Sequence, residues 1–269
     1  MEPHAPARPA VDLNPAELES VVQGLLAPGC PPSGTVRLGP YELDYLAPRA
    51  FAYTLRLLFG DRIYDVDELA EPARIIDGGG WLGLSVLRFR ALFPEARIVV
   101  FEPDPDIFRL LCRNLERNGV QNVEPVQAAL ADADGRRTFT VTGRDSGSLN
   151  AVTRGEPLVV DTRRLSPYTA EPVSLLKLNV EGAEAEVIAE LGDRLERVDQ
   201  VLIEYHGFAE LPQTLHEILA RLHEAGHTYI VSHFNETNRS CVPPLRLSAS
   251  YRYFSLIYAR RLGATASRG

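Results

Sequence analysis

Short apolar runs alternate with amphipathic segments from residue 73 to the C-terminal part of the chain. An almost continuously apolar run is typical of a strand covered on both faces. We expect such strands at 96–102, 172–180 and 198–206. Apolar residues three or four positions apart predict amphipathic helices, and these patterns cover 104–119, 182–195 and 211–226. The alternation predicts an α/β fold with a doubly wound, mostly parallel, Rossmann-like sheet.

The last two apolar runs, 227–234 and 250–261, are separated by a loop with no helical pattern. Parallel strands need a long crossover connection, usually a helix. We therefore expect these two strands to pair antiparallel and to give the sheet an antiparallel C-terminal edge strand. Asp134-Gly135 is a favoured turn pair and predicts a further hairpin within 132–142.

The alternation of apolar runs and amphipathic segments does not extend into residues 1–60. We expect a small extension of helix and strand there, and the sheet in residues 61–269. Asn14 at an N-cap, followed by Pro15 and by Glu17 at the third helical position, predicts the start of a helix. The alternation within 35–46 predicts a short strand pair.

The stretch "RIIDGGGWLGLSV" joins an apolar strand to a helical pattern, and Gly78, Gly80 and Gly83 spell G-x-G-x-x-G. This spacing is typical of a dinucleotide site when an acidic residue follows about 20 positions later. Glu102 ends the next strand, where its carboxylate can accept hydrogen bonds from ribose hydroxyls. A nicotinamide dinucleotide and S-adenosylmethionine both carry that ribose, so Glu102 does not separate them.

Asp77, directly before the first glycine, separates the two ligands. A dinucleotide places its diphosphate at the N-terminus of the helix that follows the loop, and a neighbouring carboxylate would repel that anion. S-adenosylmethionine has no phosphate and carries a sulfonium and an ammonium. Asp77 therefore favours a methyl donor over a hydride donor, with a glycine turn that binds nothing as the structural alternative.

A second group of polar residues follows the strand predicted at 172–180. Asn179 is expected at the carboxyl end of that strand, where its amide can orient a substrate hydroxyl or the cofactor. Glu181 is a candidate general base or substrate-positioning carboxylate, whereas Glu184 fits the stabilisation of a helix N-terminus better. Lys177, inside an apolar strand, suggests a buried pair with a carboxylate of a neighbouring strand.

Glu204 and His206 lie two positions apart near the end of the strand predicted at 198–206. Side chains two apart in a strand share a face. A carboxylate and an imidazole at a strand end are natural acid–base candidates, and a hydrogen-bonded structural pair is the alternative.

The net charge is −8 at pH 7, with three cysteines at distant positions. A nucleic-acid-binding domain usually presents a basic face, so we expect no nucleic-acid partner. Scattered cysteines indicate a reducing compartment. The N-terminus lacks the apolar core of a secretory signal, and no apolar run approaches the ~20 residues of a membrane span. We expect a cytoplasmic protein with no membrane partner.

These blocks together resemble the FkbM-type S-adenosylmethionine-dependent methyltransferases, over about residues 59–233. The resemblance is carried by five motifs: Asp77, Gly79 and Gly83; Phe101, Glu102 and Pro103; Leu111, Asn114 and Asn118; Lys177, Glu181, Gly182 and Glu184; and Glu204 with His206. The stretches Ala129–Gly135 and Ser146–Leu149 also fit. This chain departs from the family pattern at Asn179, where the family often has aspartate, and at Gly79-Gly80, where it often has Ala-Asn.

The resemblance implies a class I methyltransferase domain at 61–269, S-adenosyl-L-methionine as cofactor, and O-methylation of a small-molecule hydroxyl, often of a sugar or secondary metabolite. Residues 1–60 would then cap the acceptor side. The cofactor-binding candidates are Asp77, Gly78, Gly79, Gly80, Glu102, Pro103, Ala129, Ser148 and Asn179, and the catalytic candidates are Asn179, Glu181, Glu204 and His206.

Other functions, the need for a metal, the acceptor and the oligomeric state are treated next. The competing functions are an NAD-dependent oxidoreductase and a non-catalytic metabolite-binding module, which the neutral Asn179 keeps open. We expect no metal, because the residue available beside the methyl donor is an amide and the dispersed histidines and cysteines offer no zinc spacing. The acceptor's identity and a homo-oligomeric state are not decided by the sequence.

Overall fold

A seven-stranded sheet forms the centre of the computed structural model, which describes residues 13–66, 68–141, 147–149, 155–209, 211–232 and 252–262. Its strand order is β12-β13-β11-β10-β3-β4-β5. The strands are β3 (Arg74–Gly78), β4 (Arg97–Phe101), β5 (Val123–Val126), β10 (Val173–Leu178), β11 (Val198–Phe208), β12 (His227–Ser232) and β13 (Arg252–Arg261). The doubly wound, mostly parallel fold predicted from the apolar runs is confirmed.

The antiparallel part of the sheet is formed by β13, which pairs with β12 on one side and with β11 on the other. The expected antiparallel pairing of the last two strands is therefore present. The edge position belongs to β12, however, and β13 lies second from the edge. The 11 residues of β11 extend beyond its parallel neighbour β10, and this length lets β13 pair along Gln200–Phe208.

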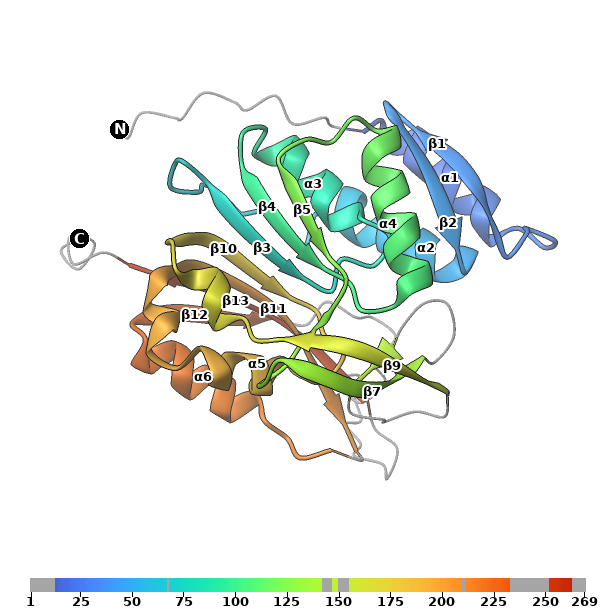
Figure 1. The fold of residues 1–269 in the computed structure, drawn as a ribbon. Coiled ribbons are helices and arrows are strands. Elements are labelled where there is room, and N and C mark those ends of the chain that lie inside the picture. The colour runs from blue at the N-terminus through green and yellow to red at the C-terminus, as the bar shows by residue number, and fades with distance from the viewer. Residues whose placement is uncertain are drawn as a thin grey trace, which may run out of the picture.

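Helices cover both faces of the sheet (Figure 1). α3 (Leu84–Leu92) and α4 (Pro105–Arg117) lie on one face, and α5 (Glu184–Leu191) and α6 (Leu215–Glu224) on the other. Successive strand residues point to opposite faces, so Ile75 joins the apolar cluster under α3 and α4, and Ile76 joins the cluster under α5 and α6. The two-faced burial explains why these strands read as continuous apolar runs.

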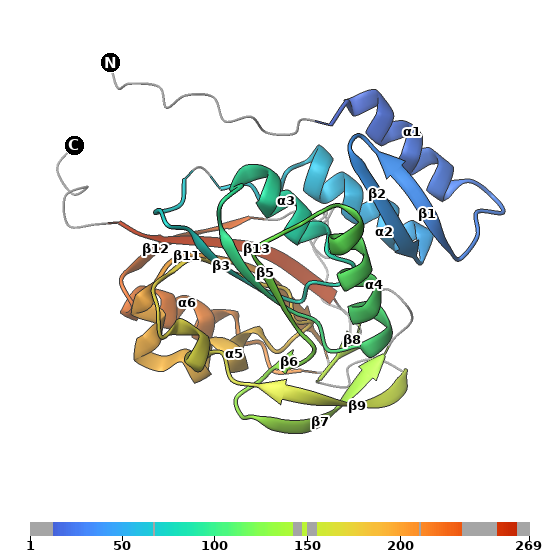
Figure 2. The ribbon, with the colours of Figure 1, turned by 45° about the horizontal axis from the view of Figure 1, so that its top comes forward.

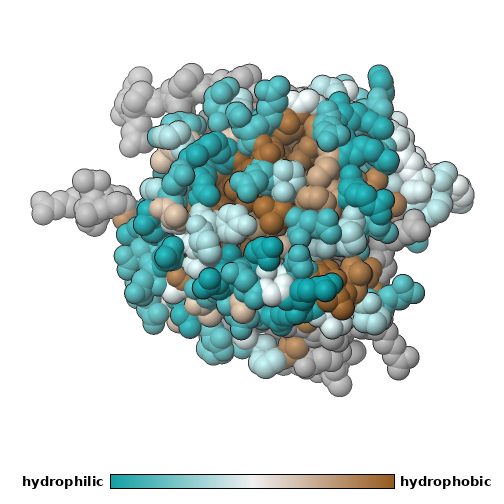
Figure 3. All heavy atoms as spheres, in the orientation of Figure 1, coloured by the Kyte–Doolittle hydropathy of each residue, from teal (hydrophilic) through white to brown (hydrophobic). Residues whose placement is uncertain are grey.

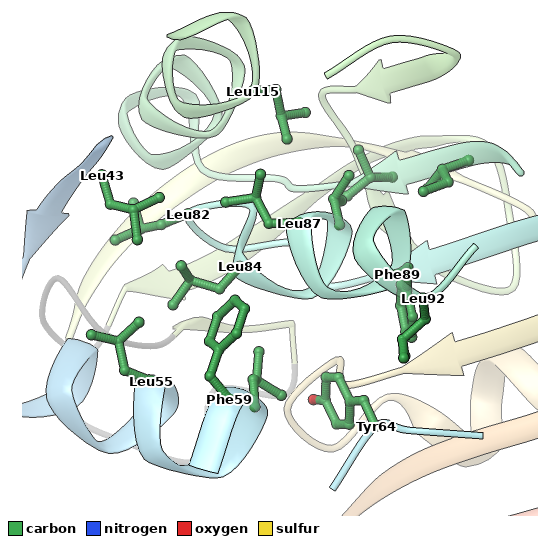
Figure 4. Close-up of a cluster of buried hydrophobic side chains, with 14 of the residues drawn as sticks. Leu43, Leu55, Phe59, Tyr64, Leu82, Leu84, Leu87, Phe89, Leu92 and Leu115 are labelled. Carbon is green, nitrogen blue, oxygen red and sulfur yellow. The ribbon is translucent and has the colours of Figure 1, made fainter. Parts of the chain in front are cut away.

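The N-terminal extension packs on the α3–α4 side (Figure 2). It consists of α1 (Pro15–Leu26), the antiparallel hairpin β1 (Ser33–Leu38) and β2 (Tyr41–Leu46), α2 (Pro48–Leu55) and a π-helical turn, Arg56–Gly60. The Asn14 side chain caps α1 by accepting from the Ala16 N–H at 2.9 Å, as the sequence predicts. Figure 4 shows how Leu55 and Phe59 of this extension meet Leu84 of α3 in the core.

A small second sheet, in the order β6-β9-β7-β8, lies beyond the carboxyl ends of the central strands. Its strands are β6 (Ala129–Leu130), β7 (Gly135–Val141), β8 (Gly147–Ser148) and β9 (Glu156–Arg163). The prediction of a hairpin at Asp134-Gly135 is wrong. The strand after this turn, β7, pairs with β9, and the strand before it, β6, pairs in parallel with β9. In the orientation of Figure 1, hydrophilic residues dominate the visible surface of the molecule, and hydrophobic residues show along β4 and β5 and beside β9 (Figure 3).

Candidate active site

A cavity of about 280 Å³ opens at the carboxyl ends of β10, β3 and β4. The ends of the strands, the glycine loop and residues of β6, β7 and α4 line it. α2 of the N-terminal extension also lines it, through Ala50, Tyr53 and Thr54. Ligands of open α/β sheets bind at this edge, so the cavity is the candidate active site.

The glycine loop is shaped by contacts with neighbouring strands. Gly79 has φ +84°, and a Cβ there would lie 1.9 Å from the Asn179 carbonyl oxygen. A Cβ on Gly80 would lie 2.2 Å from Val100 Cγ2. Neither position accepts a side chain without a shift of the backbone or of the core. The two glycines therefore let the loop lie directly against β10 and β4.

Glu102 lies in the cavity wall just after β4, as expected, with its carboxylate held by backbone donors. One oxygen accepts from the Trp81 N–H at 2.9 Å and the other from the Asp104 N–H at 3.0 Å. Burial raises the pKa of Glu102 to about 8, although these two hydrogen bonds oppose the shift. Each oxygen retains a second acceptor site, which two adjacent ribose hydroxyls can use. Pro103 and Ala129 line the cavity beside it.

Asp77 is fully buried behind the glycine loop and does not line the cavity. Its Oδ1 pairs with Lys177 Nζ at 2.8 Å, and its Oδ2 accepts from the Ser85 hydroxyl. The predicted pair between Lys177 and a carboxylate of a neighbouring strand is thus confirmed. The sequence predicts the Asp77 charge beside the ligand. In the structure, the ammonium of Lys177 neutralises that charge inside the sheet.

Lys177 connects this buried pair to the loop. Its ammonium also donates to the carbonyls of Gly78 and Gly79, at 3.2 and 2.6 Å. These contacts use all three of its donors. Among the described residues that line the cavity, Lys177 is the only lysine or arginine. The described lining of the cavity therefore offers no free cationic side chain to a diphosphate.

Asn179 and Glu181 lie where the sequence predicts, just beyond the carboxyl end of β10, and both line the cavity. Asn179 Oδ1 is buried and has no hydrogen-bond partner among the described residues. Glu181 has φ +53° and is followed by Gly182 at φ +98°. A non-glycine residue in the left-handed region is strained, and such strain clusters at functional sites.

His206 lies behind Glu181, buried between carboxylates and outside the cavity lining. Its Nδ1 is 2.8 Å from Glu184 Oε1, and its Nε2 is 3.6 Å from Glu181 Oε1. Burial on its own lowers the pKa of His206. The charges of Glu181, Glu184 and Glu204 outweigh it and raise the pKa to about 10. At neutral pH His206 is an imidazolium, which has no lone pair with which to accept a proton.

Glu204 is also buried and outside the cavity lining. It accepts a short hydrogen bond from the hydroxyl of Tyr64, which does line the cavity. The sequence does not single out Tyr64, because it lies in an irregular segment 140 positions from Glu204. Ser148 forms β8 with Gly147 opposite Thr140, and its side chain lies outside the described part of the structure. The adjacent Leu149 lines the cavity.

The asparagines of the motif at 111–118 attach the N-terminal extension to the central domain. Asn114 Oδ1 accepts from the Asp44 N–H at 2.8 Å, and its Nδ2 donates to the carbonyls of Asp44 and Leu82. Asn118 makes the equivalent pair of bonds with the backbone of Glu42. These bonds fix the hairpin β1–β2 on α4, and α2, which follows the hairpin, lines the cavity.

In the described part of the chain, no group of three or more His, Cys, Asp or Glu side chains is placed to hold a metal ion. No helix in that part has the length and hydropathy required to cross a membrane.

The hydrogen-bond acceptors and apolar side chains of the cavity fit an adenosine whose tail is positively charged. Glu102 offers acceptors for ribose hydroxyls, Ile107, Ala129 and Phe139 provide an apolar wall, and Asn179 Oδ1 is a buried acceptor without a donor. Because all three N–H donors of Lys177 already bind protein oxygens, these groups match S-adenosylmethionine better than the diphosphate of a dinucleotide. The central sheet is Rossmann-like, and the described lining of the cavity fits S-adenosylmethionine as a ligand.

Comparison with known proteins shows the family. The family model described as "Methyltransferase FkbM domain" matches residues 77–229, more than half of the chain. The chain belongs to the FkbM methyltransferase family, with S-adenosylmethionine as its cofactor. This membership decides against the nicotinamide alternative.

Two sequence relatives and one solved structure are similar to this chain. "Methyltransferase 1" of Beauveria bassiana is 29% identical over 174 residues, which cover 55% of this chain and 70% of that protein. "2-O-methyltransferase NoeI" of Sinorhizobium fredii is 30% identical over 167 residues, covering 54% and 67%. The crystal structure of methyltransferase FkbM from Methylobacillus flagellatus has a TM-score of 0.45 and 12% identity, with 79% of this chain and 53% of that chain covered.

Proposed function

We propose that the protein transfers the methyl group of S-adenosylmethionine to a hydroxyl of a neutral small molecule. The observation that carries this proposal is the position of Glu181, in the cavity wall two residues beyond Asn179. The name of the relative NoeI, a 2-O-methyltransferase, supports a hydroxyl as the acceptor.

The cavity divides into two parts with different chemistry. Glu102 and the apolar side chains near β6 and β7 mark the part for the adenosine. The opposite part is bounded by Tyr53 and Thr54 of α2 and by Leu58 and Leu84. Apart from Glu181, the described residues of that second part carry no charge, so a neutral acceptor fits it. We therefore propose that residues 1–60 cap the acceptor side.

Glu181 is the proposed proton acceptor. Its side chain is 31% exposed, and the imidazolium of His206 lies behind it. His206 and Glu184 act as positioning residues, because the buried pair between them holds the imidazolium in place. This assignment replaces the sequence hypothesis that His206 itself accepts the proton.

The reaction is a displacement at carbon. The sulfonium of the cofactor supplies an activated methyl group. As the acceptor oxygen bonds to the methyl carbon, the carbon–sulfur bond breaks with its electron pair on sulfur, and the hydroxyl proton passes to Glu181. Orientation of the two reactants lowers the activation free energy by an amount on the order of 7 kcal/mol. A positioned base adds about 10²–10⁴-fold.

The test is the release of S-adenosylhomocysteine, and of labelled methyl product, with panels of neutral alcohols, phenols and sugars and a matched panel of amines. Glu181→Gln should lower kcat by about 10²–10⁴-fold and leave S-adenosylhomocysteine binding unchanged. Glu186→Gln is the matched control, since Glu186 lies in the first turn of α5, pairs with Arg137 of β7 and does not line the cavity. Label that accumulates only on amines would refute O-methylation, and full turnover in Glu181→Gln would refute the base.

We also propose that transfer needs no metal ion. Exhaustive treatment with a chelator should leave turnover unchanged, and a loss that magnesium restores would contradict this. A cytoplasmic location and the absence of a nucleic-acid partner stay predictions from the sequence.

A further inference from the structure

Trp81, the only tryptophan of the chain, lines the cavity and carries a hydrogen-bond donor that the protein does not use. Its indole Nε1 is buried and has no hydrogen-bond partner among the described residues. An indole nitrogen can only donate, and a buried donor left unpaired costs about 1–3 kcal/mol. Such a donor beside a ligand cavity points to an oxygen atom of the ligand as its partner.

Two contacts fix the position of the indole. The Trp81 backbone N–H donates to Glu102 Oε2 at 2.9 Å, which places the residue next to the ribose site. The centroid of its ring lies 6.0 Å from that of Phe51, which is fully buried in α2. Trp81 also has φ +43°, and a non-glycine residue in the left-handed region is strained in the way that is common at ligand sites. The fold thus holds the indole between the glycine loop and α2.

The backbone donors of the glycine loop are already occupied. The N–H groups of Gly79 and Gly80 donate to the Phe101 carbonyl at 3.0 and 2.8 Å, and that of Trp81 donates to Glu102. Glycine-rich loops usually hold an anionic group on such backbone N–H groups. In this chain these three groups bind the protein itself, so an anionic part of a ligand needs a donor from elsewhere.

Side-chain donors in the cavity wall are also committed to protein oxygens. The hydrogen bonds of this kind come from Thr54, Tyr64, Ser85 and Lys177. The described lining also includes the carboxyl groups of Glu102, Asp104 and Glu181, which repel an anion when they are ionised. In this lining, the indole N–H of Trp81 is the buried side-chain donor that remains without a partner.

The methyl donor brings an anionic group into this cavity. S-adenosylmethionine carries an α-carboxylate beside its α-ammonium, and both leave water when the cofactor binds. A buried carboxylate without a hydrogen bond is costly, and a hydrogen bond to a charged group is stronger than one between neutral groups. The unused indole donor and the incoming carboxylate therefore satisfy each other.

We propose that the indole N–H of Trp81 donates a hydrogen bond to the α-carboxylate of the bound methyl donor, and that Phe51 of α2 is a positioning residue for the indole. The N-terminal extension then completes the donor site as well as capping the acceptor side. The proposal rests on the cofactor and not on the identity of the acceptor.

The test compares by calorimetry two ligands that differ only in the carboxylate. S-adenosylhomocysteine has it, whereas 5′-(3-aminopropylthio)-5′-deoxyadenosine, here the amine analogue, keeps the adenosine, the sulfur and the amine but lacks it. Trp81→Phe keeps a ring against Phe51 and removes the N–H. It should weaken S-adenosylhomocysteine about 10- to 100-fold, the scale of a hydrogen bond to a charged group, and leave the amine analogue unchanged.

Tyr258→Phe is the matched control. It also removes one hydrogen-bond donor from an aromatic side chain, the hydroxyl that donates to Gln200 at 2.9 Å, and Tyr258 does not line the cavity. Both ligands should bind this variant as they bind the wild type.

A second measurement uses the unaltered chain. Because the chain has a single tryptophan, a ¹⁵N-labelled sample gives a single indole N–H signal in an NMR spectrum. S-adenosylhomocysteine should move that proton downfield as the N–H binds the carboxylate, and the amine analogue should leave it near its position in the free protein. This result decides the question even if Trp81→Phe does not fold.

Equal losses of affinity for the two ligands in Trp81→Phe would show that the ring acts by packing alone, and would overturn the proposal. So would an unchanged affinity for S-adenosylhomocysteine, or an indole signal that responds alike to both ligands. Neither measurement uses turnover. Failure of the proposed O-methylation would leave these binding results unchanged, so the two ideas fail separately.

Discussion

Donor binding should depend on pH through Glu102. Its carboxyl is buried, and its pKa is about 8 in the protein without a ligand. At pH 7 roughly a tenth of the Glu102 carboxyls are therefore ionised. Ribose hydroxyls donate more strongly to a carboxylate than to a neutral acid. Binding should select the ionised form and release close to one proton at pH 7.

The magnitude follows from that pKa. Below pH 8, affinity should rise by up to about tenfold per pH unit, equivalent to about 1.4 kcal/mol, and it should level off above pH 8. Calorimetry with 5′-methylthioadenosine at pH 6, 7, 8 and 9 measures this slope without interference from the α-amino group. Two buffers of different ionisation enthalpy at pH 7 count the released proton.

Two variants make the result specific. Glu102→Gln should bind more weakly and show a flat pH profile, whereas Glu186→Gln should keep the wild-type slope because Glu186 lies outside the cavity. A flat profile in the wild type, or a slope that persists in Glu102→Gln, would refute the assignment of Glu102 to the ribose.

Three further predictions concern stability. Gly79→Ala should destabilise the protein by more than about 2 kcal/mol in thermal unfolding, because the new Cβ would meet the Asn179 carbonyl at 1.9 Å; an unchanged Tm would contradict this. Lys177→Met should cost about 3–5 kcal/mol in denaturant unfolding by leaving Asp77 buried without its cation, whereas Arg37→Met, at an exposed pair, should have little effect. The pKa of His206 is raised from 6.5 to about 10, so its stabilising contribution is complete below pH 6.5 and lost as the pH rises through 10; His206→Gln should flatten that decline.

Burial on both faces made the central strands predictable. Lys177 was informative for the same reason, since a charge inside an apolar strand requires a partner on an adjacent strand, and Asp77 is that partner. The start of α3 could not be read from the sequence. Trp81 and Gly83 have φ +43° and +87°, so the loop continues past the glycines and the helix begins at Leu84.

Long-range pairing explains what the sequence did not show. A turn pair such as Asp134-Gly135 fixes only a local reversal, and the partner of β7 is supplied by β9, more than 20 residues later. The position of β13 between β11 and β12 is equally non-local. Tyr64 reaches Glu204 through tertiary packing, and no periodicity in its own segment indicates that contact.

A crystal structure of the complex with S-adenosylhomocysteine tests the central claim most directly. The account predicts that the ribose hydroxyls contact both oxygens of Glu102 and that the α-ammonium contacts Asn179 Oδ1. It also predicts that the sulfur faces the space between Glu181 and α2. A ligand that places its ammonium away from Asn179, or that fills the space under Tyr53 and Thr54 and leaves no room for an acceptor, would contradict the account.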